Sequence, residues 1–484
     1  MENFKEVLDK NPIFGIVAEA SKLLNLETYV VGGYVRDLFL MRPNKDIDFV
    51  TVGSGIELAQ KASELAGLQN HVNIFKNFGT AQFVYNDYDI EFVGARKESY
   101  RSDSRKPTTE NGTLEEDQQR RDFTINAMGI SLSAKKFGEL IDPFGGVADL
   151  ESRTIKTPLE PEKTFSDDPL RMMRAVRFAS QLNFDIDGET FSAIKSMAAR
   201  IEIVSQERIT DELNKIILSQ KPSYGFKLLH QCGLLEIIFP DFVKLLGVET
   251  QDGKGHKDNF YHTLQVLDNI SLTTNDLWVR WAAILHDIAK PATKKFSLKV
   301  GWSFHGHEEL GARWVKGIFR KMKLPLDEKM RKVTNLVRLH LRPIALAKDG
   351  VTDSAVRRLL VEAGEDLDDL LRLCRADITS KDPTRVRKYL KNYDRVEEML
   401  VEIQEKDKLR NFQPVLTGEL IMKIFDLPPC KEVGLLKNEI REAILDCKIE
   451  NNLKQSYQLL LEVAQKMDFS PVKNLDEVLD KIPD

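Results

Sequence analysis

The sequence has few cysteines and no long apolar segment. Only four of its 484 residues are cysteines, and their spacing suggests no pairs: Cys232, Cys374, Cys430 and Cys447. Disulfide-rich secreted domains have paired cysteine spacings, so we expect a reduced, cytoplasmic setting. No apolar run of about 18 or more residues is present, which predicts no helix across a membrane. The opening residues, MENFKEVLDK, also lack the apolar core of a signal peptide.

The chain has no excess of positive charge. It contains 70 Lys and Arg against 75 Asp and Glu, which gives a formal net charge of −5 at pH 7. This balance argues against a generally basic surface, but local patches can still bind RNA. Three stretches are locally basic: 96–121, 313–342 and 381–410. Each of them alone is explained as simply by a solvated helix face or loop.

Two parts of the sequence differ in pattern. Up to about residue 150, β-branched and aromatic runs end in Gly or Asn, which indicates strands: TYVVGG, KDIDFVTVG, TAQFVYN and YDIEFVGA. Residues 56–66 fit a helix, and 101–119 read as a long polar, mobile loop. After residue 160 apolar residues recur with the period of a helix almost to the end. The length suggests three or four domains.

Two carboxylates of the first part lie two residues apart on an expected strand. Asp46 and Asp48 would therefore share one strand face. Such a pair repels itself unless a cation lies between the carboxylates, and hard oxygen ligands suit Mg²⁺. A third carboxylate should come from a neighbouring strand, where we prefer Glu91 to Asp89. A solvent-facing acidic edge is the alternative for the pair taken alone.

A glycine pair lies close to these carboxylates. Gly32 and Gly33 end an expected strand and open a helix that carries Arg36. Small residues let backbone N–H groups approach a phosphate at a helix N-terminus, and an arginine adds a bidentate contact. Glycines, helix start, arginine and both carboxylates fall within 17 positions. Phosphoryl transfer needs this combination.

The blocks GGYVRD and KDIDFV resemble the head of class II tRNA nucleotidyltransferases and bacterial poly(A) polymerases, which have a polymerase-β-like head. Further blocks follow in the order of that family: RRDFTINAMG (120–129), IDPFGGVADL (141–150), DDPLRMMRAVRFASQLNF (167–184) and ERITDELNKIIL (207–218). The resemblance is close over about 25–240. It implies an α+β head with a mixed sheet and helices, followed by a long all-α body.

The resemblance also implies roles for charged residues. Asp46, Asp48 and Glu91 would be catalytic, with Mg²⁺ on Asp46 and Asp48. Nucleotide would bind to the residues Gly32, Gly33, Arg36, Arg121, Asp168, Arg171, Arg174 and Arg177. The substrates would be the 3′ end of tRNA with CTP and ATP, and the product a CCA end made without a nucleic-acid template.

The block that begins DDPLR fits this choice of bases. Arg171, Arg174 and Arg177 share one side of an expected helix, while Leu170, Met173, Val176 and Phe178 can face the core. A carboxylate only accepts hydrogen bonds and a guanidinium only donates them. Cytosine and adenine both fit Asp168 with Arg171, whereas uracil and guanine leave mismatched polar groups. A basic surface helix is the plainer alternative.

Two features bear on the type of nucleotide addition. Members of the family that add only C lack a flexible loop before the RRDF block, whereas ESYRSDSRKP is present here. Poly(A) polymerases usually carry a basic, aromatic block where this chain has NIFKNFGTAQF. We therefore expect CCA addition, with an A-adding enzyme or a poly(A) polymerase as alternatives.

Five of the eight histidines fall between His262 and His340. The dipeptide His286–Asp287 with distant partners resembles the HD phosphohydrolase superfamily. The resemblance implies metal ligands at His262, His286, Asp287 and Asp377, and at His307 and His340 in a two-metal form. Imidazoles with carboxylates suit Mn, Fe, Co, Ni or Zn better than Mg²⁺.

This region would hydrolyse phosphomonoesters or cyclic phosphodiesters, for example at damaged tRNA ends. An inactive helical scaffold is one alternative. An HD phosphohydrolase whose head merely binds nucleotide is another, although paired carboxylates beside Gly33 argue against it.

Four domains are expected: a nucleotidyltransferase head (1–150), a helical neck that recognises the base (151–245), an HD-type domain (246–380) and a tRNA-binding tail (381–484). The tail resembles the tRNA-anchoring helices of members that contain an HD domain, with Lys431 and Lys437 as candidate phosphate contacts. No membrane partner is expected, and no protein partner is indicated.

Overall fold

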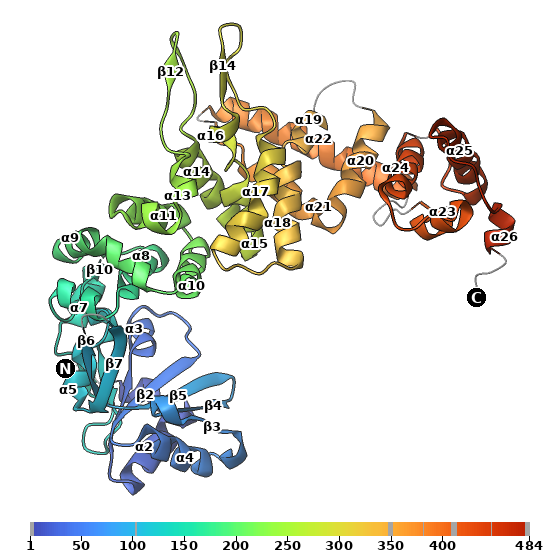
Figure 1. The fold of residues 1–484 in the computed structure, drawn as a ribbon. Helices are drawn as coiled ribbons and strands as arrows, with labels where there is room; N and C mark the ends of the chain where they lie inside the picture. Colours follow the sequence, from blue (N-terminus) through green and yellow to red (C-terminus); the bar gives the residue numbers. More distant parts are fainter. Residues whose placement is uncertain are drawn as a thin grey trace. The chain divides into compact units, whose positions relative to one another are not determined.

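The computed structural model describes residues 4–101, 104–346, 352–380, 382–407, 414–446 and 448–479, with only the backbone for 97–101, 104–109 and 405–407. Cys447 lies outside the described residues. The chain divides into two compact units (Figure 1). The first is Met1–Leu246 with Lys321–Leu324, and the second is Gly247–Arg320 with Pro325–Asp484.

The first unit begins with a seven-stranded mixed sheet in the order β3-β4-β5-β2-β1-β8-β9. β2 is parallel to β5 and antiparallel to β1. The bounds are β1 (Glu27–Val31), β2 (Asp46–Val52), β3 (Asn73–Phe75), β4 (Thr80–Tyr85), β5 (Tyr88–Gly94), β8 (Gly129–Ser131) and β9 (Leu140–Ile141). The expected mixed sheet is confirmed.

Aromatic packing on one face of the sheet decides where its polar side chains point. Phe49, Phe92 and Phe83 stack in a row across β2, β5 and β4, with ring centroids 5.2 and 5.4 Å apart. The helices α2 (Pro12–Leu23) and α4 (Gly55–Leu65) lie beside this sheet (Figure 1). Ile47 and Phe49 are buried, so the alternation of the strand turns Asp46 and Asp48 to the opposite face.

The expectation of a long loop over 101–119 is wrong. β6 (Arg96–Arg101) and β7 (Ser104–Asn111) form an antiparallel hairpin, and α5 (Leu114–Gln119) follows it. Thr113 and Glu116 form a capping box at the start of α5. The sequence did not predict these elements because the segment is polar. A hairpin whose strands are joined by backbone hydrogen bonds, and a helix with a capping box, can form without an apolar face.

The rest of the first unit is mostly helical. Its central helix is α8 (Leu170–Leu182), with Pro169 as its N-cap. The remaining elements are α1 (Lys5–Leu8), α3 (Gly33–Phe39), α6 (Gly146–Glu151), β10 (Thr154–Ile155), α7 (Pro161–Asp167), β11 (Asp185–Ile186), α9 (Gly188–Met197), α10 (Gln206–Ile217), α11 (Pro222–Gln231), α12 (Leu234–Ile238) and α13 (Pro240–Val243).

The second unit is helical apart from two short hairpins. Its helices are α14 (Asn259–Ser271), α15 (Leu277–Leu285), α16 (Lys290–Thr293), α17 (His307–Lys321), α18 (Glu328–Leu339), α19 (Arg342–Leu346), α20 (Asp353–Ala363), α21 (Leu367–Ala376), α22 (Pro383–Asp407), α23 (Gly418–Phe425), α24 (Lys431–Leu445), α25 (Leu453–Lys466) and α26 (Leu475–Leu479). α23 to α26 share an apolar core of their own. Within the described ranges, no helix is long and apolar enough to span a membrane.

Candidate active site and candidate metal centre

A polar cavity of about 540 Å³ opens in the first unit. The expected nucleotide-binding residues all line it, together with Asp46 and Asp48. Residues that the sequence did not single out complete the lining: Tyr34, Asn44, Arg120, Asp122, Asn126, Phe178, Gln181 and Arg208. The strand with the paired carboxylates and the arginine-bearing helix α8 therefore face one space.

The carboxylates of the sheet lie as the strand period predicts. In the parallel register of β2 and β5, Asp46 lies opposite Asp89 and Asp48 opposite Glu91. Burial, and then the charge of Asp48, raise the pKa of Glu91. Burial also raises the pKa of Asp48, although Arg121 opposes this effect. Neither Glu91 nor Asp89 is among the cavity-lining residues, so the choice of a third carboxylate stays a prediction.

Gly32 lies where a side chain would be obstructed. Its φ is +75°, and a Cβ there would lie 3.1 Å from Arg121 Nη1 and 3.4 Å from Asp48 Oδ2. Glycine tolerates this φ and keeps the space beside the carboxylate open. Arg36, in the middle of α3, donates to Asn126 Oδ1 at 2.8 Å and pairs with Asp37 at 2.9 Å.

Buried acids hold the arginines of the cavity. Arg174 Nε donates to Asp122 Oδ2 at 2.7 Å, and Arg177 Nε lies 3.2 Å from Glu212 Oε2. Burial alone would raise the pKa of Asp122, but Arg174 and Asn126 lower it to about 2. Burial lowers the pKa of Arg177 to about 10, against the opposing charge of Glu212. Both arginines therefore stay charged at pH 7.

Phe178 lies at the centre of these arginines. The guanidinium carbons of Arg36, Arg174 and Arg177 lie 5.1, 5.5 and 4.0 Å from the centroid of its ring. The ring is buried, as expected for a core residue, but it also lines the cavity. Its face thus supports three cations that would otherwise repel one another.

Asp168 and Arg171 both line the cavity, but their side chains bind other partners and not each other. Asp168 Oδ1 accepts from the Leu170 amide at 3.1 Å, and its Oδ2 accepts from Arg208 Nη2 at 3.2 Å. Arg171 Nη2 donates to the carbonyl of Arg120 at 2.6 Å. Arg208 lies in the ERITDEL block, so the resemblance pointed to its segment but not to this contact.

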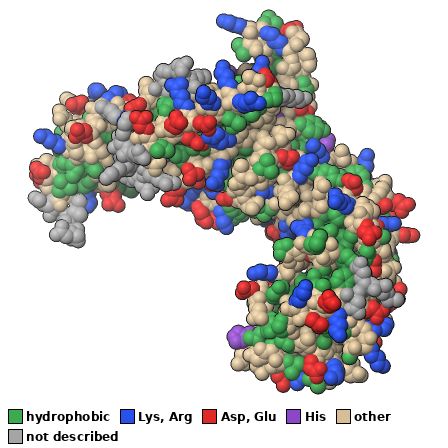
Figure 2. Space-filling model, turned by 180° about the vertical axis from the view of Figure 1, so that it is seen from behind, with side chains coloured by type: hydrophobic (Ala, Val, Ile, Leu, Met, Phe, Trp, Pro, Cys, Tyr) green, Lys and Arg blue, Asp and Glu red, His purple; other side chains and the backbone are tan. Residues whose placement is uncertain are grey.

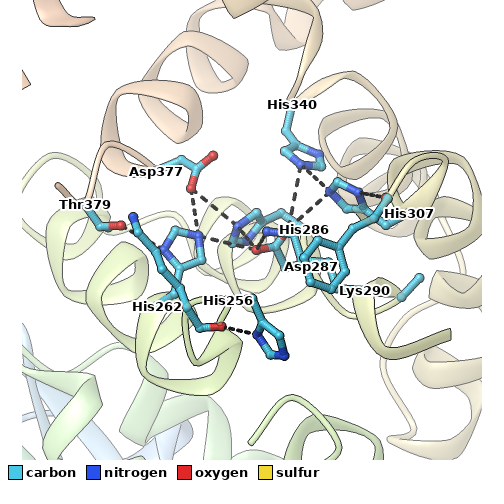
Figure 3. A network of polar contacts seen from close by, with 12 residues as sticks. His256, His262, His286, Asp287, Lys290, His307, His340, Asp377 and Thr379 are labelled. Carbon is cyan, nitrogen blue, oxygen red and sulfur yellow. Dashed lines mark hydrogen bonds and ion pairs between the residues drawn. The ribbon is translucent and has the colours of Figure 1, made fainter. Parts of the chain in front are cut away.

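The second unit brings together all six residues expected at the HD site (Figure 3). His286 and Asp287 lie together at the end of α15, and the other four come from the ends of α14, α17, α18 and α21. The Nε2 atoms of His262 and His286 lie 3.3 and 3.2 Å from Oδ2 of Asp287. Those of His307 and His340 lie 3.2 and 4.0 Å from its Oδ1.

Asp377 and a lysine complete the surroundings of Asp287. Asp377 Oδ1 lies 3.0 Å from His262 Nε2, and Lys290 Nζ lies 2.6 Å from Asp287 Oδ2. The ligand atoms of His262, His286 and Asp287 lie within 4.8 Å of one another, as do those of Asp287, His307 and His340. Asp287 thus belongs to two possible metal-binding groups.

The opposite ring nitrogens of the four histidines are each anchored. Their Nδ1 atoms lie 2.7 to 2.8 Å from oxygen atoms of Thr379, Ala283, Phe304 and Val337. A carbonyl oxygen on Nδ1 requires a proton there, which leaves the Nε2 lone pair free for a metal ion. Within the described ranges, the buried Nε2 of His286 makes no well-aligned hydrogen bond, although Asp287 Oδ2 lies 3.2 Å away.

Electrostatics also favour a cation at this centre. Burial alone would raise the pKa of Asp287, but His286 and Lys290 hold it well below its usual range. Burial lowers the pKa of His340 to about 4, so this imidazole is neutral at pH 7. Burial would also lower the pKa of His262, but Asp287 and Asp377 raise it to about 9. The negative charge of both carboxylates therefore favours a cation at this centre.

In the tail, Lys431 is the exposed first residue of α24, and Lys437 is half-buried on the same helix. Their expected phosphate contacts stay a prediction.

Parts of the chain match three known families. Residues 28–156 match the poly A polymerase head domain, and 183–246 match the probable RNA and SrmB-binding site of polymerase A. Residues 259–382 match the HD domain. The order of these matches follows the order of the parts described above.

The fold is similar to two solved structures. One is a CCA-adding enzyme in an apo form, with a TM-score of 0.62, 21% identity and coverage of 96% of this chain and 97% of that chain. The other is a tRNA nucleotidyltransferase complexed with a primer tRNA and an incoming ATP analog. Its TM-score is 0.55 at 25% identity, with coverage of 79% of this chain and 99% of that chain.

Two relatives are similar in sequence. A multifunctional CCA protein of Dechloromonas aromatica is 34% identical over 310 residues, which are 62% of this chain and 71% of that protein. An A-adding tRNA nucleotidyltransferase of Deinococcus radiodurans is 33% identical over 344 residues, which are 68% of this chain and 75% of that protein. Together with the matched head and HD domains, this similarity confirms the resemblance, and the chain belongs to the tRNA nucleotidyltransferase family of enzymes.

Proposed function

We propose that this enzyme adds C, C and A to the 3′ end of tRNA from CTP and ATP, by two-metal nucleotidyl transfer without a nucleic-acid template. One observation carries the proposal: the paired carboxylates of β2 and the charged side chains of α8 line a single cavity. We assign catalysis to the head (1–150), base recognition to the neck (151–245), hydrolysis to 246–380 and tRNA binding to 381–484. Lys431 and Lys437 are our candidates for tRNA phosphate contacts.

In this proposal the arginines bind the triphosphate. Arg121, Arg174 and Arg177 face the cavity, and Arg36 joins them beside Gly32 and Gly33. Asp122 and Glu212 orient two of these guanidinium groups before the nucleotide arrives. Such preorganised cations stabilise the negative charge that develops on a phosphoryl group during transfer.

In this proposal the carboxylates bind the metal ions that act on the reacting atoms. Asp46 and Asp48, with Glu91 on the neighbouring strand, would hold Mg²⁺ through oxygen ligands, in agreement with the donor set of this face. Mg²⁺ when bound supplies positive charge at the tRNA 3′-hydroxyl and at the triphosphate. The 3′-hydroxyl loses its proton to water, its oxygen bonds to the α-phosphorus, the bond to the β-phosphate bridging oxygen breaks, and pyrophosphate leaves.

Asp168 and Arg171 would select the base. Asp168 would accept from the exocyclic amine of C or A, and Arg171 would donate to the ring nitrogen. Arg208 holds the carboxylate of Asp168 at 3.2 Å and thereby fixes its direction. Uracil and guanine would place a carbonyl against this carboxylate and a ring N–H against the guanidinium, so both would be rejected.

The similar proteins leave open which nucleotides are added, because one relative is named a CCA protein and another an A-adding enzyme. Transcripts of tRNA that end before CCA, after C and after CC, each offered CTP or ATP alone, distinguish the cases. A CCA-adding enzyme extends the first two with CTP and the third with ATP. Extension of the third transcript alone would indicate an A-adding enzyme, and repeated A addition to unrelated RNA would indicate a poly(A) polymerase.

The second unit supports a second activity, hydrolysis of phosphomonoesters or 2′,3′-cyclic phosphodiesters. The donor set fits a transition metal, because the Nε2 atoms of four imidazoles surround the carboxylate of Asp287 in two groups that could each hold an ion. Mn, Fe, Co, Ni or Zn would be held by His262, His286, Asp287 and Asp377, and a second ion by Asp287, His307 and His340.

The metal when bound would activate water and neutralise the phosphate. Asp287 would offer one carboxylate oxygen to each group of histidines, and the backbone anchors would hold the imidazoles in place. Release of phosphate, or ring opening of a cyclic nucleotide, measured with each metal in turn, tests the activity. If the wild type binds no transition metal and hydrolyses none of these substrates, this region is an inactive scaffold.

A further inference from the structure

Two β-hairpins project side by side from the second unit (Figure 1). β12 (Thr250–Gln251) pairs with β13 (Lys254–Gly255), and β14 (Lys295–Ser297) pairs with β15 (Gly301–Ser303). Lys254 Nζ donates to the carbonyl of Leu298 at 2.8 Å, and the indole N–H of Trp302 donates to the carbonyl of Lys254 at 3.0 Å. These bonds join the two hairpins, and we refer to residues 247–258 and 290–306 together as the hairpin arm.

The hairpin arm is basic, although the chain as a whole is acidic. It contains six lysines and only three acidic residues, against a net charge of −5 for the protein. Two of these acidic residues already have partners, because Glu249 pairs with Lys294 at 2.9 Å and Asp258 caps α14. Lys257, Lys295 and Lys299 are exposed. Figure 2 shows lysine side chains, in blue, at the outer end of this projection, and the arm contains no arginine.

Aromatic rings lie between the lysines. Phe296, Trp302 and Phe304 are half-exposed, and Lys294 Nζ lies 4.4 Å from the centroid of the Trp302 ring. Proteins that bind single-stranded nucleic acid combine such rings, on which bases stack, with cations that track the phosphates. The composition of the arm therefore fits an unpaired RNA strand.

The base of the hairpin arm reaches the Asp287 centre. The carbonyl of Phe304 accepts from His307 Nδ1 at 2.7 Å, and its ring lies 5.7 Å from Lys290 Nζ. Lys290 in turn lies 2.6 Å from Asp287 Oδ2 and begins α16, which leads directly into β14. Its side chain is 19% exposed, whereas that of Asp287 is 1% exposed. A chain of contacts thus connects the exposed lysines with the buried carboxylate.

We propose that the hairpin arm binds the single-stranded 3′ end of an RNA and directs its terminal phosphate ester to the Asp287 centre. The proposal rests on the hydrolase activity proposed above, and it makes RNA ends rather than free nucleotides the substrate. In the reaction the oxygen of one water bonds to phosphorus and one ribose ester P–O bond breaks. The leaving ribose oxygen takes a proton from that water, and no oxidant or reductant is needed.

RNA binding tests the arm without any metal. The triple variant Lys257→Glu/Lys295→Glu/Lys299→Glu is compared with wild type and with Lys316→Glu, which reverses an exposed charge on α17 outside the arm. Fluorescence anisotropy of a labelled single-stranded decaribonucleotide measures Kd. We expect binding by the triple variant to be at least tenfold weaker, with a salt slope lower by about 2, since each lost phosphate contact removes roughly 0.7. Equal affinity in all three proteins would overturn the proposal.

Hydrolysis then distinguishes the arm from the centre. With Mn²⁺ or Ni²⁺, each protein is given decaribonucleotides with a 2′,3′-cyclic or an open terminal phosphate, and 2′,3′-cyclic AMP as the small substrate. The triple variant should lose about tenfold or more in kcat/KM for the oligonucleotides and keep its rate on cyclic AMP. Equal losses on both would contradict the arm. A wild type inactive on all substrates would contradict the hydrolase, while the binding comparison would still decide whether the arm holds RNA.

Discussion

The carboxylate of Asp168 accepts a hydrogen bond from Arg208 Nη2 at 3.2 Å, and both residues line the cavity that holds Asp46 and Asp48. If Asp168 selects the base by hydrogen bonding, Arg208 is the residue that orients the carboxylate of Asp168. We expect Arg208→Ala to raise misincorporation of U and G by about tenfold, because a misdirected carboxylate no longer distinguishes an amine from a carbonyl.

The measurement for Arg208→Ala is kcat/KM for each of the four nucleoside triphosphates on a tRNA transcript. Lys227→Ala, which removes an exposed cation from α11 outside the cavity, is the matched control. An Arg208→Ala enzyme that is slower with all four nucleotides in equal measure would mean that Arg208 serves triphosphate binding or folding instead.

Removal of Asp46 or Asp48 should nearly abolish nucleotide addition. We expect Asp46→Ala and Asp48→Ala each to lower kcat by roughly a thousandfold with Mg²⁺ as the only metal, because the metal loses its oxygen ligands. Circular dichroism should show the wild-type fold, since these side chains are on the sheet face opposite the aromatic core. Incorporation within tenfold of wild type would disprove the assignment.

A matched pair of variants on β5 tests which residue supplies the third catalytic carboxylate. Glu91 lies opposite Asp48 and Asp89 lies opposite Asp46, both on β5. Glu91→Ala should lower kcat by roughly a hundredfold, and Asp89→Ala should leave it within a few fold. The reverse ranking would move the catalytic role to Asp89, and equal small effects would leave Asp46 and Asp48 as the only acidic ligands.

The local parts of the active site were predictable from the sequence, and the long-range ones were not. The period of a strand predicts that Asp46 and Asp48 share a face, and the period of a helix groups Arg171, Arg174 and Arg177. The partners Asp122 and Arg208 lie 52 and 40 residues from Arg174 and Asp168, so only tertiary packing brings them together.

The same division holds in the second unit. The motif around His286 and Asp287 indicated the candidate ligands by resemblance. It did not indicate that the two oxygens of Asp287 face different histidine groups, or that backbone carbonyls orient the rings. The hairpin β6–β7 was missed because its residues are polar and its strands are bonded through the backbone.

Asp122 should make the stability of the enzyme depend on pH in the acid range. Its folded pKa of about 2 lies below the usual 3.8, so its ionised form stabilises the fold above the unfolded pKa, and this contribution is lost as pH falls through the folded pKa. The shift corresponds to about 2 kcal/mol at pH 7 and to roughly half of that at pH 3. Asp122→Asn removes it and keeps the shape of the side chain.

The test for Asp122 is the difference in the free energy of unfolding between wild type and Asp122→Asn, measured with urea at pH 7, 5, 4 and 3. The difference should shrink as pH falls. A difference that is the same at every pH would show that the variant acts through lost hydrogen bonds to Asn126 and Phe123 and not through the charge paired with Arg174.

The two activities should separate both by mutation and by metal. His286→Ala should abolish hydrolysis and leave nucleotide addition unchanged, because His286 belongs to the second compact unit and the paired carboxylates to the first, and sites without shared ligands behave independently.

After removal of all metals with a chelator, Mg²⁺ alone should restore nucleotide addition, whereas hydrolysis should return only with Mn²⁺, Co²⁺ or Ni²⁺, because the ligands around Asp287 are mostly imidazoles. The wild type treated in the same way is the control. Loss of nucleotide addition in a folded His286→Ala enzyme would show that the units are coupled, and hydrolysis restored by Mg²⁺ alone would contradict the metal preference while leaving the hydrolase itself intact.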